Sequence, residues 1–181
     1  SLESYAFQGT SAVTYEIPAG ITSISPLVFF GNTTIESYTV AVGNPSYIAQ
    51  NGIVYSKDGT VLVMYPFQSR VGTFAIPANV KEIGAYAFYG ASSINISTLR
   101  VTLPASVKSI GDYAFHNRNV EFVYCKSLTP PFLGGANVFG NDWGTSWKCK
   151  YYVPMSAVDD YKKAPYWKDL GDNIVGYDFT E

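Results

Sequence analysis

The chain has 181 residues, of which 47% are hydrophobic, 16% aromatic and 14% charged, which is typical of a folded chain with a substantial core and excludes a disordered tail. A formal net charge of −2 without basic runs provides no face that could neutralise phosphates, so nucleic acid is not an expected partner. The apolar stretches are too short to cross a bilayer, so we expect no transmembrane segment.

The chain begins close to Ser4-Tyr5-Ala6-Phe7, a string that recurs as the end of a repeat further along the sequence. Neither a basic segment nor an apolar stretch of the kind found in export signals precedes it. We therefore expect the chain to be the C-terminal part of a longer protein, with its export signal upstream of these residues.

Three segments align without gaps, and each reads as an aliphatic residue, Pro-Ala, an aliphatic residue and an isoleucine at constant spacing. They are Ile17–Ile24, Ile76–Ile83 and Leu103–Ile110, and a phenylalanine follows each after five residues. Because Pro77 and Pro104 are 27 residues apart, one repeat has the length of one coil of a solenoid. The repeats predict a mostly β solenoid whose phenylalanines stack from coil to coil as a hydrophobic spine.

The residues before each proline alternate in polarity, as expected for a strand with one buried face. In the third repeat, Leu99, Val101 and Leu103 would face the core, whereas Arg100 and Thr102 would face solvent. The proline ends the strand without removing a ladder hydrogen bond.

Pro18 and Pro77 are 59 residues apart, which corresponds to about two coils. Between them, residues 51–63 alternate on both sides of Asp58-Gly59, a pair that is typical of a tight hairpin turn. We expect an inserted β-hairpin near residues 51–65, which explains the longer interval.

The C-terminal part predicts two further strands, at 120–124 and 151–154, and then a capping unit. Ser156 and Asp159 have the spacing of a capping box, and Pro165 would limit the helix that follows. Trp167, Leu170, Ile174 and Val175 could then cover the last coil. We expect one solenoid domain over residues 1–181, with repeat coils to residue 150 and a capping unit over 151–181.

Residues with catalytic or metal-binding chemistry are few. The only histidine, His116, is interpreted as an exposed turn residue, and no serine lies in a Gly-x-Ser-x-Gly string. Cys125 and Cys149 lack Cys-x-x-Cys spacing, and strand alternation places them on opposite faces, which favours two unpaired thiols. We expect no enzyme activity, no metal and no cofactor.

The outward strand positions of a solenoid form one extended surface. Its C-terminal end combines charges with an aromatic residue, a composition that is typical of protein contacts. The candidate binding residues there are Arg100, Thr102, Glu121, Val123, Lys150 and Tyr152.

Trp143 and Trp147 form a second candidate site, in the glycine-rich segment 134–147. Exposed, coplanar tryptophan rings would favour stacking on sugars, whereas burial as part of the cap would favour a protein partner for the strand face.

The strings at 76–88 and 103–115 resemble the BspA-like leucine-rich repeats of bacterial surface proteins, whose hallmark is Ile-Pro-x-x-Val-x-x-Ile-Gly-x-x-Ala-Phe. The first repeat departs from it, because it lacks the glycine after Ile24 and carries Pro26. The resemblance implies right-handed coils with short parallel strands, as in the Bacteroides type, and a secreted or surface-anchored location. It also implies a binding module that contacts host proteins, matrix or other bacteria, and we expect this module to be non-catalytic and monomeric. A glycan-binding module and a structural spacer are the alternatives.

Overall fold

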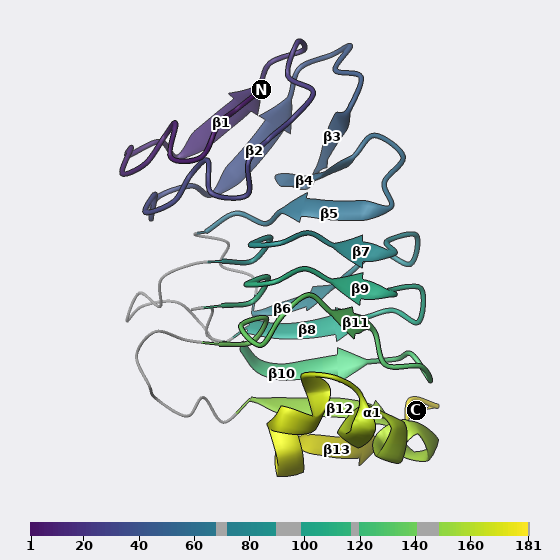
Figure 1. The fold of residues 1–181 in the computed structure, drawn as a ribbon. Coiled ribbons are helices and arrows are strands. Elements are labelled where there is room, and N and C mark those ends of the chain that lie inside the picture. The colour runs from purple at the N-terminus through teal and green to yellow at the C-terminus, as the bar shows by residue number, and fades with distance from the viewer. Residues whose placement is uncertain (68–71, 90–98, 117–119, 141–148, 181) are drawn as a thin grey trace.

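The computed structural model describes residues 1–67, 72–89, 99–116, 120–140 and 149–180. The chain winds into a stack of coils from the N-terminal to the C-terminal end, with short strands on two sides, and within the described ranges its helices lie near the C-terminus (Figure 1). The predicted β-solenoid is confirmed.

A five-stranded parallel sheet, here called the main sheet, takes one strand from each successive coil. Its order is β6, β8, β10, β12 and β13, so chain order and spatial order coincide. The strands are Thr73–Ala75, Leu99–Leu103, Val120–Cys125, Lys150–Pro154 and Ile174–Tyr177. Leu99, Val101 and Leu103 are buried, whereas Arg100 is exposed and Thr102 half-buried, so the predicted alternation of β8 is confirmed.

The second sheet contains the short strands that follow Pro77 and Pro104. Its parallel part has the order β11, β9, β7 and β5, and the antiparallel strands β4 and β3 extend it. The bounds are Tyr47–Gln50, Ile53–Ser56, Val61–Met64, Glu82–Ile83, Ser109–Ile110 and Phe132–Leu133, for β3, β4, β5, β7, β9 and β11 respectively.

The inserted hairpin consists of β4 and β5 and turns at Asp58-Gly59 as predicted. It is larger than expected, because β3 adds a third antiparallel strand that starts at Tyr47. The added strand is only four residues long and two of its residues are Ala and Gln, so its alternation is too weak to identify it in the sequence.

The two N-terminal strands form a separate parallel sheet. They are β1, Thr14–Ile17, and β2, Ser37–Val40. The insertion lies against β2, where the Tyr38 backbone N–H donates to the Gly52 carbonyl over 2.9 Å. A Cβ on Gly52 would lie 2.9 Å from the Ser37 Cβ, so this close approach depends on glycine.

The hydrophobic core consists of two clusters, one for the main stack and one for the N-terminal part. A larger cluster of buried side chains runs from the insertion to Ile174, and a smaller one contains Ile17, Val28, Ile35, Tyr38, Val54 and Met64. Stacked rings continue through the larger cluster, with centroid distances of 4.7 Å between Phe88 and Phe115 and 5.5 Å between Phe115 and Phe139. The predicted spine is confirmed, and Tyr65 extends it into the insertion at 4.6 Å from Phe88.

The C-terminal segment consists of a 3₁₀ turn at Met155–Ala157, the helix α1 at Val158–Lys163 and a second 3₁₀ segment at Trp167–Asn173. The predicted capping box is wrong, because no side chain caps the start of α1. The chain already adopts a helical turn at Met155, so Ser156 lies inside that turn and not at its boundary. The helix ends before Pro165 as predicted, with Ala164 extended.

Trp167 packs this segment against the last coil. It is fully buried, and its Nε1–H donates to the Pro131 carbonyl over 2.7 Å. Tyr161, also fully buried, donates its hydroxyl hydrogen to the Ser127 carbonyl over 3.0 Å. These contacts explain how the segment covers the coil that ends the main stack.

Two predictions about reactive side chains are wrong. His116 is buried and not exposed: its Nδ1 lies 3.2 Å from the Asn137 carbonyl and its ring stacks on Tyr89 at 5.8 Å. Cys125 and Cys149 lie in the same core cluster and not on opposite faces, although both thiols are free. Burial raises the pKa of the Cys149 thiol to about 12 and also raises the pKa of Cys125.

Candidate functional site

The main sheet brings most of the predicted binding residues side by side. In its parallel register, Arg100 lies beside Phe122, and Phe122 lies beside Lys150. One pair further along, Thr102 lies beside Tyr124, which lies beside Tyr152. Neighbouring strands therefore present these side chains in two rows on the outer surface of the sheet.

Val123 is the exception and was wrongly predicted to face solvent. It is fully buried and lies between Val101 and Tyr151, which are buried too. The register of β10 shifts between Val120 and Phe122, so the strict alternation counted from Glu121 does not apply there. The same shift turns Cys125 into the core.

The shift also places two aromatic residues at the outer surface, Phe122 and Tyr124, which sequence reasoning missed. Both are half-buried, with Val120 and Val123 buried on either side of Phe122. Val120 and Val123 are three positions apart, whereas core-facing residues of a regular strand are an even number of positions apart. This odd spacing of two valines is the sequence signal that indicates a bulge.

Aromatic rings join across the strands into a continuous patch, here called the aromatic face. Tyr124 and Tyr152 are stacked at 4.9 Å with 16° between the ring planes, and Phe122 lies 5.7 Å from Tyr152. Tyr177 packs against Tyr152 at 5.4 Å, and Phe179 against Tyr177 at 4.9 Å. The face thus consists of Phe122, Tyr124, Tyr152, Tyr177 and Phe179.

Basic side chains border the aromatic face. The Arg100 guanidinium lies 5.1 Å from the centre of the Phe122 ring, and its Nη2 forms an ion pair with Glu121 Oε2 at 3.1 Å. The Lys126 amine lies 6.0 Å from the Phe179 ring. Lys150 Nζ donates to Asn173 Oδ1 over 3.1 Å. The five remaining predicted residues, Arg100, Thr102, Glu121, Lys150 and Tyr152, therefore lie on or beside this face.

The Tyr124 phenol is uncharged at neutral pH. Partial burial, followed by the nearby Tyr152 and Tyr177, raises the pKa of Tyr124 above its ordinary value, although Arg100 acts in the opposite direction. A protonated phenol both donates and accepts hydrogen bonds. The aromatic face can thus offer apolar ring surface together with directional polar contacts.

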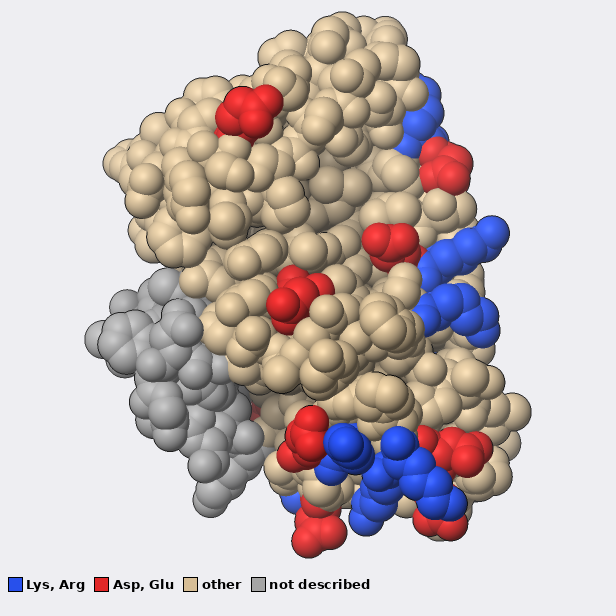
Figure 2. Space-filling model, in the orientation of Figure 1, with Lys and Arg blue, Asp and Glu red and all other residues tan. Residues whose placement is uncertain are grey.

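Trp143 and Trp147, the second candidate site, lie outside the described residues. Among the residues that are described, no group of three or more His, Cys, Asp and Glu side chains could hold a metal ion. In the same ranges, no helix is long and apolar enough to span a membrane. Figure 2 shows acidic and basic side chains mixed around the C-terminal helices, with further charged side chains along the right edge of the view.

Comparison with known proteins identifies the repeats. The sequence matches the model of the BspA type leucine rich repeat region in six copies, over residues 1–55 and 64–129. No curated protein matches the sequence.

Three solved structures of similar fold are bacterial proteins. A leucine rich cell surface protein from Faecalibacterium prausnitzii is 22% identical, with a TM-score of 0.55 over 85% of this chain and 45% of that chain. A leucine-rich repeat protein from Eubacterium ventriosum is 22% identical, with a TM-score of 0.51 over 81% and 44%. The pneumococcal vaccine antigen PcpA is 18% identical, with a TM-score of 0.50 over 94% and 56%. The chain spans about half the length of these structures, and at such identities the likeness shows a common fold.

Proposed function

The chain belongs to the family of BspA-type leucine-rich repeats, and from this premise we propose that it is a non-catalytic binding module of the bacterial surface that contacts a protein partner. We assign the contact to the aromatic face. The observation that carries this assignment is the patch of four mutually packed rings, Phe122, Tyr124, Tyr152 and Tyr177, on the solvent side of the main sheet.

The composition of the face supports a protein partner. Tyrosine and arginine are enriched among the residues that dominate binding energy at protein interfaces. Tyr177 remains 39% exposed and Arg100 is exposed, so a partner could remove further apolar and cationic surface from water. Because the rings already pack against one another, they lose little side-chain entropy when a partner binds.

The proposed location at the surface is supported by the names of the similar structures. One is a cell surface protein and another a vaccine antigen. Neither name states a binding partner, so the assignment of a partner rests on the aromatic face.

A glycan is the alternative ligand, because the near-parallel rings of Tyr124 and Tyr152 could also stack on sugars. A spacer function predicts that the face binds nothing. Both alternatives are outcomes of the experiment that follows.

A biosensor screen against extracellular matrix proteins and a glycan array tests the proposal. We expect binding to at least one protein, and Tyr152→Ala should weaken its affinity at least tenfold. This factor corresponds to a loss of about 1.4 kcal/mol or more of binding free energy. Phe132→Ala is the matched control, because Phe132 is 65% exposed on β11 of the other sheet. Binding only to glycans would favour the alternative, and equal losses in both variants would contradict the assignment.

A further inference from the structure

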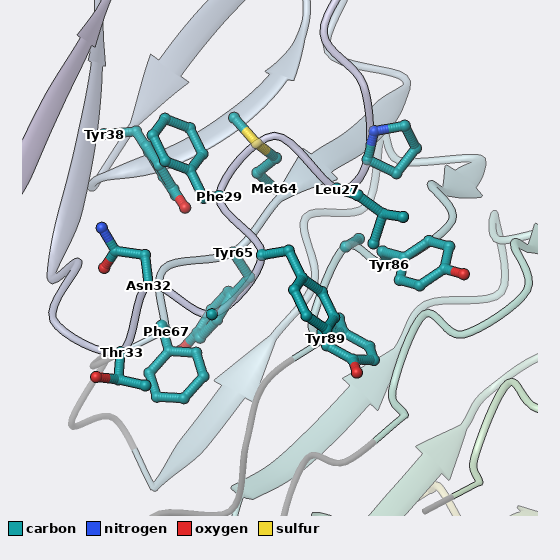
Figure 3. A pocket seen from close by; sticks show the side chains of 14 residues that line it. Leu27, Phe29, Asn32, Thr33, Tyr38, Met64, Tyr65, Phe67, Tyr86 and Tyr89 are labelled. Carbon is teal, nitrogen blue, oxygen red and sulfur yellow. The ribbon is translucent and has the colours of Figure 1, made fainter. Parts of the chain in front are cut away.

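A cavity of about 290 Å³ lies where the N-terminal sheet meets the rest of the stack (Figure 3). Its walls come from four segments: residues 26–33, β2, the end of β5 with the residues after it, and the turn at residues 86–89. Tyr38 and Met64 belong to the smaller core cluster, whereas Tyr65 and Ala87 belong to the larger one. The cavity is therefore the space that remains where the two cores meet.

The described lining is aromatic and uncharged. Among the described residues that line the cavity, half are Phe or Tyr, and none is Asp, Glu, Lys, Arg or His. A charged ligand would lose its hydration here without gaining an ionic partner. The cavity is thus suited to a neutral ligand with a flat apolar surface.

The Tyr38 hydroxyl lies inside the cavity and has no hydrogen-bond partner among the residues that the structure describes. Tyr38 is 5% exposed. Figure 3 shows this hydroxyl directed from β2 toward the space beside Asn32 and Tyr65. Burial raises the pKa of Tyr38, so the hydroxyl is protonated at neutral pH and can donate or accept. Buried polar groups are usually satisfied, and a ligand atom at this point would satisfy this one.

Asn32 also lines the cavity, but its amide is already engaged. Its Nδ2 donates to Thr10 Oγ1 over 2.8 Å, and its Oδ1 accepts from the backbone N–H groups of Thr34 at 3.0 Å and Ile35 at 3.1 Å. A sugar would bring several hydroxyls, and those without partners would each carry a desolvation penalty. The chemistry of the site therefore favours a ligand with a single polar group.

We infer that this cavity binds an uncharged aromatic ring with one hydrogen-bonding group, of the phenol or indole type, whose polar atom pairs with the Tyr38 hydroxyl. A cavity of about 150 Å³ already accommodates benzene, so the space is sufficient for one such ring with its substituents. The ring can come from a free small molecule or from a Tyr or Trp side chain on another protein. Because the cavity shares no residue with the aromatic face, the inference is independent of the proposed function.

Ligand-observed NMR titrations with p-cresol and toluene test the polar contact. We expect p-cresol to bind about threefold to tenfold more tightly than toluene, the factor that one net hydrogen bond provides. In Tyr38→Phe, this ratio should fall to about one while toluene binding is retained, because the aromatic wall remains. Absence of p-cresol binding, or the same ratio in both proteins, would overturn the inference.

Two tryptophan variants test the location. Leu27→Trp fills the cavity from its half-buried rim and should abolish binding of both compounds. Leu128→Trp is the matched control, because Leu128 is 64% exposed and outside the lining, and it should bind both like the parent chain. If Leu27→Trp, folded as judged by circular dichroism, binds p-cresol unchanged, the cavity is not the site.

N-acetyl-tyrosinamide distinguishes the two sources of the ring. Competition between this compound and p-cresol supports entry of a side chain attached to a peptide, whereas binding of p-cresol alone supports a free small molecule. Tyr152→Ala should leave p-cresol binding unchanged, so that failure of this inference and failure of the aromatic face are distinguishable.

Discussion

Glycines in the coil turns set how closely neighbouring coils approach. A Cβ on Gly111 would lie 2.3 Å from the Ala85 backbone nitrogen and 2.6 Å from its Cα, so one coil would have to move away from the next. The residue two positions later, Tyr113, adopts the left-handed conformation with φ of 57°, as does Tyr86 in the preceding coil with φ of 59°. The tight turn therefore combines a glycine that permits contact with a tyrosine held in an unfavourable backbone conformation.

Gly111→Ala should lower the free energy of unfolding by about 1–3 kcal/mol, the usual cost of overpacking against an unyielding neighbour. Urea denaturation measures the change. Gly20→Ala is the control, because nothing lies within 4 Å of the position of its Cβ. Equal stability of the two variants would show that the coils are not in close contact at Gly111.

Tyr38 and Tyr161 are both buried, but only Tyr161 has a described hydrogen-bond acceptor, the Ser127 carbonyl. Tyr38→Phe should therefore raise the unfolding free energy of the ligand-free chain by about 1 kcal/mol, because it removes a buried hydroxyl that has no partner among the described residues. Tyr161→Phe should lower it by about 1–2 kcal/mol, because it leaves a buried carbonyl unpaired. Chemical denaturation of both variants provides the comparison, and a loss of stability in both would contradict it.

At the scale of elements, regular repeats could be predicted and local irregularities could not. The alternation in β8 and the Phe88–Phe115 stack follow directly from the repeated string. Val123 was misplaced because a bulge exchanges the two faces of a strand without changing its composition. His116 was misplaced because its burial depends on Tyr89 and Asn137, which come from other coils.

Only part of the candidate site could be predicted, because regular alternation places some of its residues and the bulge in β10 places others. Arg100 and Thr102 lie on a strand whose alternation holds, and Lys150 and Tyr152 on another. Phe122 and Tyr124 reach the surface only through the bulge, and Tyr177 joins them only because β13 pairs with β12. Strand pairing between distant segments is not encoded in any local pattern, so the full aromatic face required the fold.

The stacked phenylalanines predict how the destabilisation caused by a core substitution spreads from coil to coil. Phe115→Ala should cost about 3–5 kcal/mol, because it removes a buried ring that packs between Phe88 and Phe139. Since each coil contacts only its neighbours, amide exchange should accelerate in β7, β9 and β11 and much less in β1 and β2. Exchange measured by mass spectrometry tests this, with Phe132→Ala as the exposed control. Uniform acceleration over the whole chain would contradict a nearest-neighbour solenoid.

In the whole molecule, the two core clusters meet at one junction, and the two candidate binding regions lie in different places. The aromatic face lies on the main sheet over β10, β12 and β13, whereas the cavity lies between the smaller and larger clusters. The fold thus offers a broad contact surface and a partly open aromatic cavity in separate places.

Buried thiols and phenols make the stability of the whole fold sensitive to alkaline pH. Burial raises the pKa of Cys149 to about 12, and burial with the nearby Tyr65 raises that of Tyr55 to about 12. In the unfolded chain these groups lose their protons at about pH 8.5 and pH 10. The folded chain keeps the protons, so the contribution to stability is complete below about pH 8.5 and is lost as the pH rises toward 12.

The unfolding free energy should therefore fall continuously as the pH is raised above about 8.5, and the decrease should be smaller in Cys149→Ser. Urea titrations at a series of pH values measure the slope. A constant unfolding free energy up to about pH 11 would contradict the burial of these groups.

An amide-exchange footprint of the complex with a protein found in the binding screen shows whether the aromatic face contacts the partner. We expect slower exchange in β10, β12 and β13, together with unchanged exchange in β3 and β4 of the other sheet. Slower exchange confined to β3 and β4, with β10, β12 and β13 unaffected, would contradict it.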